Sequence, residues 1–147
     1  MAYNYLSPFT LQAPDGPKLI RHYSTDNVGN TESPKTAAFT LDITPPQAGL
    51  LCPGMTGGFC RVYKGTVAVL GSVSDLNFSG YKLEYAAGKD GTVFTTINAG
   101  TAAISGALGW WKAPGEGFYT LRLTVTDFAA NATVVSAVVY AGEPAML

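Results

Sequence analysis

The sequence has few charged residues, two cysteines and a single histidine. Only 13% of the 147 residues are Asp, Glu, Lys or Arg, and the formal net charge is −1. The nine Lys and Arg residues are scattered singly, so no basic stripe is offered to nucleic acid or to an anionic lipid surface. Two cysteines and one distant histidine also fall short of the four ligands of a zinc site. We therefore expect no nucleic-acid partner, no metal and no other cofactor.

Long apolar runs and helical periodicity are missing as well. The most apolar stretch, residues 132–141, is too short to cross a bilayer and alternates with a period of two, as a strand does. No ten-residue window keeps a 3.6-residue period without a Gly or Pro in it. Residues 1–5 have neither the basic nor the apolar region of a signal peptide, so we expect a recombinant fragment or a mature piece of something longer. The chain is predicted to be all-β, with no membrane segment.

A short motif occurs twice, at a distance equal to one immunoglobulin-sized sandwich. Residues 25–30, Thr-Asp-Asn-Val-Gly-Asn, reappear as Thr-Asp-Phe-Ala-Ala-Asn at residues 126–131, which is 101 residues later. In each copy an alternating strand leads into the motif and a β-rich strand leaves it, so both copies are predicted to be hairpin turns. Ala130 replaces the turn glycine of the first copy, so the second turn is expected to be strained or to adopt another geometry. The turn residues are Asp26, Gly29, Asn30, Asp127 and Asn131.

The position of the two motifs predicts two unequal units. The first Asp has only 25 residues ahead of it, whereas about 80 residues separate the second from Pro45-Pro46. Consecutive prolines cannot donate to a β-ladder and stiffen the chain, so we place the boundary there. Residues 1–46 are predicted to be the C-terminal half of an Ig-like unit, and residues 47–147 a complete Ig-like β-sandwich. Such a half leaves an apolar face in water and strand edges unpaired.

Alternation and turn residues locate the individual strands. The first unit is expected to contain strands at 8–12, 18–25 and 36–43, with a turn at 14–17. The second is expected to contain seven strands, at 48–51, 61–72, 80–86, 92–98, 107–112, 117–126 and 132–141. In the strand before Asp127, the side chains of Leu121, Leu123 and Val125 are predicted to face inward. Tyr119 is predicted to be a structural corner tyrosine, whose hydroxyl bonds back to the backbone.

The first unit carries a family signature. Residues 23–32, Tyr-Ser-Thr-Asp-Asn-Val-Gly-Asn-Thr-Glu, followed by Phe-Thr-Leu-Asp-Ile-Thr-Pro-Pro at 39–46, resemble the end of the bacterial extracellular Ig-like repeat of the outer-membrane-adhesin type. Residues 80–85 and 117–127 resemble a related Ig-like or fibronectin-type module. The resemblance implies a β-sandwich outside the cytoplasm, used as a spacer, an adhesive unit or an accessory domain. The chain departs from the repeat in lacking its N-terminal strands.

The two cysteines bracket a glycine-rich loop. Cys52 and Cys60 are separated by Pro-Gly-Met-Thr-Gly-Gly-Phe, which is flexible enough to bring them together. In an exported protein they are predicted to form a local disulfide, which stabilises the fold by about 2–3 kcal/mol on the chain-entropy model. The alternative is a pair of reduced thiols, as cytosolic proteins keep them.

Few residues suggest chemistry. Asp26 and Asp127, with Asp42 or Glu32, are candidate calcium ligands at a domain joint; the favoured alternative is that each Asp accepts hydrogen bonds from its own turn, since no Asp-x-Asp cluster supplies enough oxygens. His22 has no nucleophile elbow to serve and is expected to be a packing or surface residue. We therefore expect no catalytic residues and no enzymatic activity.

Trp110 and Trp111 are adjacent in a predicted strand, so one of them must face outward. The outer ring is a candidate platform for stacking a sugar, which would make carbohydrate a partner. The alternative is that one Trp fills the core and the other lies under a loop or a neighbouring domain.

The incomplete first unit leads to the main functional hypothesis. Its apolar residues are expected to form a face covered by another protein chain, either a second copy or a different one, through strand addition. The alternatives are that the half-unit docks on the complete one or that a boundary cuts a longer protein. We expect an extracellular structural or adhesive module of a surface filament, with an accessory domain of a secreted hydrolase as the second hypothesis. The interface residues are Phe9, Leu11, Ile20, Phe39 and Leu41.

Overall fold

The computed structural model describes residues 4–51, 60–62 and 65–143, and it divides the chain into two compact units, Met1–Thr44 and Pro45–Leu147. The division falls at the Pro45-Pro46 pair. Every regular element in the described part of the chain is a β-strand, which confirms the predicted all-β class. No helix that could span a membrane occurs among these residues.

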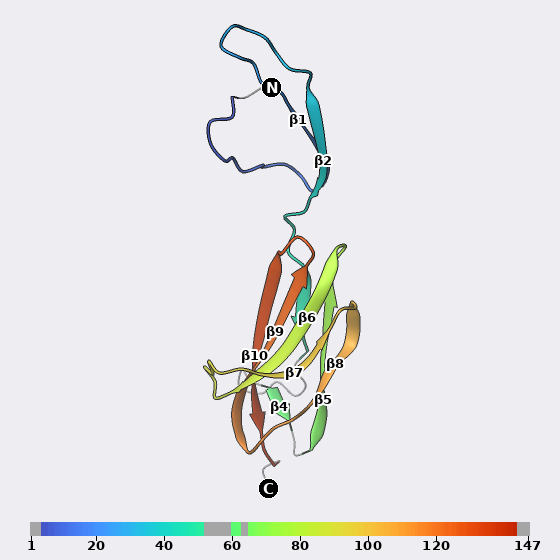
Figure 1. Ribbon diagram of the computed structural model, residues 1–147. Coiled ribbons are helices and arrows are strands. Elements are labelled where there is room, and N and C mark those ends of the chain that lie inside the picture. The colour runs from blue at the N-terminus through green and yellow to red at the C-terminus, as the bar shows by residue number, and fades with distance from the viewer. Residues whose placement is uncertain (1–3, 52–59, 63–64, 144–147) are drawn as a thin grey trace. The chain divides into compact units, whose positions relative to one another are not determined.

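The first unit is built on one hairpin. Strands β1 (Gly16–His22) and β2 (Lys35–Leu41) pair in antiparallel fashion and form a two-stranded sheet (Figure 1). Asp15 ties the two ends together, because its carboxylate accepts hydrogen bonds from the backbone N–H of Ile43, at 2.8 Å, and from the hydroxyl of Thr44.

Two predictions for this unit are wrong. Residues 8–12 do not form a strand, since they pair with neither β1 nor β2. The first strand also begins at Gly16, inside the predicted turn, because Gly16 adopts a φ of 115° that lets the chain turn directly into the ladder.

The second unit is a two-layered sandwich (Figure 1). One sheet has five strands in the order β4-β10-β9-β6-β7, and the other has three in the order β3-β5-β8. The predicted strand 61–72 is in fact two strands that belong to different sheets, so the unit has eight described strands. Their bounds are β3 Gln47–Leu50, β4 Cys60–Val62, β5 Thr66–Ser74, β6 Phe78–Ala87, β7 Thr95–Gly100, β8 Ile104–Lys112, β9 Gly117–Asp127 and β10 Ala132–Ala141.

The core lies between the two sheets. Leu83 of β6 and Leu123 of β9 come from the five-stranded sheet, and Leu108 of β8 comes from the other; all three are fully buried. The predicted inward face of β9 is confirmed, since Leu121, Leu123 and Val125 are all buried. Full burial of each such side chain favours folding by about 1.5–3 kcal/mol, so the second unit has a core of its own.

Tyr119 is the corner tyrosine predicted from the sequence. Its hydroxyl donates to the backbone carbonyl of Gly115 at 2.9 Å and accepts from the N–H of the same residue at 3.1 Å. The ring packs edge-on against Trp111, with centroids 5.3 Å apart. Tyr119 therefore fixes the bend before β9 to the aromatic part of the core.

Candidate functional site

The first turn motif is closed by its own aspartate. Oδ1 of Asp26 accepts hydrogen bonds from the backbone N–H of Val28, at 3.0 Å, and of Asn30, at 2.9 Å, while Oδ2 accepts from the Asn30 side-chain amide at 2.8 Å. These bonds, led by the Asn30 amide, lower the pKa of Asp26 below its usual value. Gly29 closes the turn with a φ of 91°. The residues repeated in the sequence are thus those that hold the turn.

The second turn has the same construction. Oδ1 of Asp127 accepts from the backbone N–H of Asn131 at 2.9 Å, and Oδ2 accepts from its side-chain amide at 2.7 Å. Ala130 takes the place of the glycine and keeps the left-handed backbone, with a φ of 68°. The sequence left two outcomes open for this turn, a strained backbone or another geometry. The structure shows the strained backbone, because the left-handed conformation is kept and an alanine adopts it.

The contacts of the two aspartates are those expected for a hydrogen-bonded turn, the favoured alternative. Glu32 is engaged in the same way, because its carboxylate accepts from the Ser24 N–H at 2.8 Å and pairs with Lys35 at 3.1 Å. Oδ1 of Asp42 accepts from the N–H of Thr44 at 3.2 Å. The donors of these bonds lie in the same loops or at the strand end beside them.

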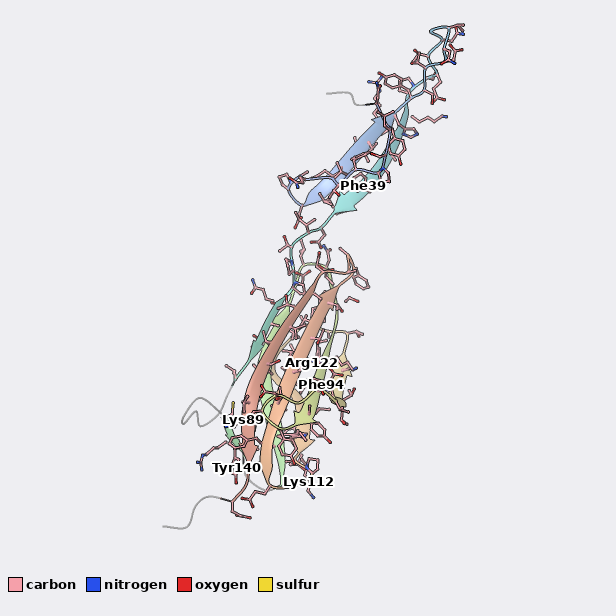
Figure 2. All side chains as sticks on the ribbon, turned by 90° about the vertical axis from the view of Figure 1, so that its left-hand side faces the viewer. Phe39, Lys89, Phe94, Lys112, Arg122 and Tyr140 are labelled. Carbon is pink, nitrogen blue, oxygen red and sulfur yellow. The ribbon has the colours of Figure 1, made fainter. Side chains whose placement is uncertain are left out.

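The hairpin of the first unit brings three of the five predicted interface residues together. In the ladder, Leu41 lies opposite Gly16, Phe39 opposite Lys18 and Ile20 opposite Ala37. Paired residues of an antiparallel ladder share a face, so Ile20, Phe39 and Leu41 lie on one side of the sheet. Figure 2 labels Phe39 on this hairpin. We call this side the hairpin face, and it comprises Gly16, Lys18, Ile20, His22, Lys35, Ala37, Phe39 and Leu41.

The other two predicted interface residues do not join that face through a strand. Phe9 and Leu11 lie in the segment before β1, and Phe9 is 64% exposed. The ring of Phe9 meets only Tyr5 among the described aromatic rings, edge to face, with centroids 6.4 Å apart. Phe9 and Leu11 therefore do not lie in a strand, and their role in an interface stays a prediction.

The hairpin face is only partly shielded from solvent. Ile20, Phe39 and Leu41 are half-buried, and His22 is exposed, as a surface histidine. None of the described residues 4–44 is buried. The first unit thus has a two-stranded sheet with apolar side chains on it and no core beneath them.

The second unit contains the same hairpin in a covered state. The bridge Thr25–Thr31 matches the pair Thr126–Ala132, and the pair Gly16–Leu41 matches Gly117–Ala141. The counterparts of Lys18, Ile20, His22, Phe39 and Leu41 are therefore Tyr119, Leu121, Leu123, Val139 and Ala141. All five counterparts are buried. One hairpin is covered by a sheet, and its repeat is not.

The two tryptophans point to opposite faces of β8, as predicted for adjacent residues of a strand. Trp111 is 3% exposed and contacts Tyr85 and Tyr119 in the core, whereas Trp110 is 67% exposed on the outer side of the three-stranded sheet. Trp110 pairs with Ala68 of β5, a small residue that leaves the ring uncovered on that strand. An exposed indole ring is therefore available for stacking.

Only one of the two cysteines of the predicted disulfide lies in the described part of the chain. Cys60 opens β4 and is buried in the core, where this strand runs parallel to β10. Cys52 lies outside the described residues, so the bond to Cys60 stays a prediction.

One charged cluster was missed from the sequence. Glu84 lies opposite Arg122 on the outer face of the five-stranded sheet, is only 4% exposed, and accepts from Arg122 at 2.8 Å and from Lys82 at 2.7 Å. Burial raises the pKa of Glu84, but the hydrogen bonds from Lys82 and Arg122 outweigh this effect and hold the pKa below its usual value. Phe94 stacks on the Arg122 guanidinium, 3.5 Å from ring centroid to Cζ (Figure 2). Only the strand register reveals this cluster, and the spacing of the residues in the sequence does not.

Comparison with known proteins adds little to this geometry. No model of a protein family matches the sequence, and no curated protein matches it. Among solved structures, a crystal structure of an engineered protein is similar with 21% identity and a TM-score of 0.46. That match covers 65% of this chain and 20% of the engineered one. The chain is therefore classified by its own fold alone, as an all-β protein whose second unit is a two-sheet sandwich.

Proposed function

We propose that this chain is a non-enzymatic, extracellular structural or adhesive module of the Ig-like type, part of a surface filament or hetero-assembly. Its second unit is a self-sufficient sandwich, and its first unit is completed by strands from a partner chain. The resemblance of residues 23–46 to extracellular adhesin repeats and the low charge of the chain support this proposal.

The single observation that carries the proposal is the contrast between the two hairpins. Both have the same turn and the same antiparallel pairing, with one residue more between turn and second strand in the first, yet the second buries its inner face and the first buries none of its described residues. Open strand edges and apolar faces are a liability that native proteins cover. A partner polypeptide supplies that cover in the proposed assembly.

Site-specific photo-crosslinking tests the proposal. A photoreactive residue is placed at Phe39, on the hairpin face, and in a matched chain at Thr40, which points to the opposite side of β2. Each purified chain is mixed with cell-surface proteins of the organism that makes it, and products are identified by mass spectrometry. A β-rich surface protein crosslinked from position 39 but not from position 40 supports the proposal. A chain that stays monomeric and crosslinks equally from both positions, or from neither, contradicts it.

A second function is favoured by the exposed ring of Trp110. In this alternative the chain is an accessory domain of a secreted hydrolase and stacks a sugar on the indole. Binding to a glycan array that is lost in Trp110→Ala and kept in Leu76→Ala, which truncates another exposed side chain, favours this alternative. Equal glycan binding by both variants, or none by the wild-type chain, removes it.

A further inference from the structure

The covered hairpin of the second unit shows which strand the open hairpin lacks. Strand β9 has β10 on one side and β6 on the other, and β6 runs antiparallel to it. Strand β1 is the counterpart of β9 and has β2 on one side only. The empty position is therefore the one that β6 occupies in the second unit.

The free edge of β1 can be assigned to particular backbone groups. At the turn, the carbonyl of Ser24 and the N–H of Asp26 bond across to the β2 side of the hairpin. Because the backbone groups of successive strand residues point to opposite edges, the N–H and C=O groups of Leu19 and Arg21 lie on the open edge. A new strand would bond to these two residues.

The side chains define what that strand must carry. In the second unit Tyr85 lies opposite Leu121, and Ala87 lies opposite Tyr119. The corresponding positions on β1 are Ile20 and Lys18. A complementary strand thus needs an apolar side chain opposite Ile20 and is favoured by an acidic one opposite Lys18.

We propose that the partner adds one strand antiparallel to β1, along the edge of Leu19 and Arg21. This inference rests on the proposed function. The donor is a segment of a different polypeptide with an alternating apolar pattern and an acidic residue opposite Lys18.

A second copy of the chain is a poorer donor. Its own β6 is held between β9 and β7 and is not free to leave. Strand β1 of a second copy has the sequence Gly-Pro-Lys-Leu-Ile-Arg-His, so it offers no acidic side chain to Lys18. Strand β7, an edge strand, carries Thr-Thr-Ile-Asn-Ala-Gly and lacks the apolar alternation.

Hydrogen exchange with a defined peptide tests the inference. The probe is a synthetic peptide with the sequence of residues 78–87 and the change Ala87→Glu, added to the ¹⁵N-labelled full chain. The amides of Leu19 and Arg21 are expected to exchange more slowly at saturating peptide, by about tenfold or more, because they gain hydrogen-bond acceptors. A peptide with Ala87→Lys is expected to protect them less, since it places a like charge opposite Lys18.

Two chain variants locate the binding edge. Leu19→Pro removes an N–H from the open edge of β1, whereas Thr36→Pro, the matched control, removes one from the outer edge of β2 by the same alternation. Cross-strand proton contacts between Ile20 and Ala37 report whether the hairpin persists in each variant. Protection by the peptide should vanish in Leu19→Pro and remain in Thr36→Pro.

Three results would overturn the inference. They are no protection of the β1 amides in the wild-type chain, protection along the β2 edge instead, and protection that appears without peptide as the chain concentration rises, which identifies a second copy as the donor. If any of these results is found together with a specific crosslink from Phe39, the proposed function is still supported. Only the inference about the β1 edge and its donor strand is then wrong.

Discussion

Replacing Ala130 by glycine is predicted to stabilise the second unit. Ala130 is an exposed residue at a φ of 68°, where a Cβ costs about 1–2 kcal/mol. Glycine removes that cost but loses more conformational freedom on folding, which takes back about 0.4–1 kcal/mol. The net gain is about 0.5–1 kcal/mol, or about 2–8 °C in Tm for a unit of this size.

The measurement is urea unfolding of the full chain, followed by the fluorescence of the buried Trp111. The matched control is Ala129→Gly in the same turn. Ala129 is exposed and, unlike Ala130, has no positive φ, so this change should destabilise by about 0.5–1 kcal/mol. The two variants should move the midpoint in opposite directions with unchanged m-values. If Ala130→Gly lowers the midpoint as much as Ala129→Gly does, the left-handed turn is not strained and the reasoning fails.

Three further predictions concern the second unit. Glu84→Gln is expected to destabilise it by about 1–3 kcal/mol at pH 7, because the carboxylate charge that pairs with Lys82 and Arg122 is lost. The lowered pKa of Glu84 means that its contribution is present above pH 4.5 and is lost as the pH falls through the folded-state pKa, so wild type and Glu84→Gln should converge in thermal melts at acid pH. Tyr119→Phe should cost about 0.5–1.5 kcal/mol in urea unfolding, since the hydroxyl bonds to Gly115 disappear, and an unchanged midpoint would contradict the corner role. Reduction of the predicted Cys52–Cys60 disulfide should lower stability by about 2–3 kcal/mol, and a melt insensitive to reductant in an oxidised sample would refute the bond.

The sequence predicted those features of the fold that depend on residues close together in the chain, such as the alternation of apolar and polar side chains in a strand. Strand β10 has the predicted bounds, and the inward face of β9 follows directly from Leu121, Leu123 and Val125. The hydrogen bonds of the Asp26 and Asp127 turns were also predictable, because the Asp, the left-handed residue and the Asn recur at fixed spacing. Such features depend on neighbours in the chain.

Features that depend on distant partners could not be predicted in this way. Residues 8–12 have the alternation of a strand, but they pair with no other strand of the unit, and alternation alone does not report pairing. Residues 61–72 read as one strand, yet β4 and β5 join different sheets. The cluster at Glu84 requires the register of β6 on β9, which places residues 38 positions apart opposite each other.

The differences between the two hairpins bear on how the open one is covered. At matched positions of the ladder, the buried Tyr119 and Leu123 of the second unit are replaced by Lys18 and His22 in the first. Ile20, Ala37, Phe39 and Leu41 are the apolar side chains that remain on the face. A permanently buried core rarely contains an ammonium group, because removing an unpaired ammonium group from water is costly. On a face that is exposed to water before a partner binds, the same group increases solubility. The basic residues therefore favour a hairpin that meets its donor strand after folding, with an acidic group on the donor neutralising Lys18, over one built to sit inside a finished sandwich.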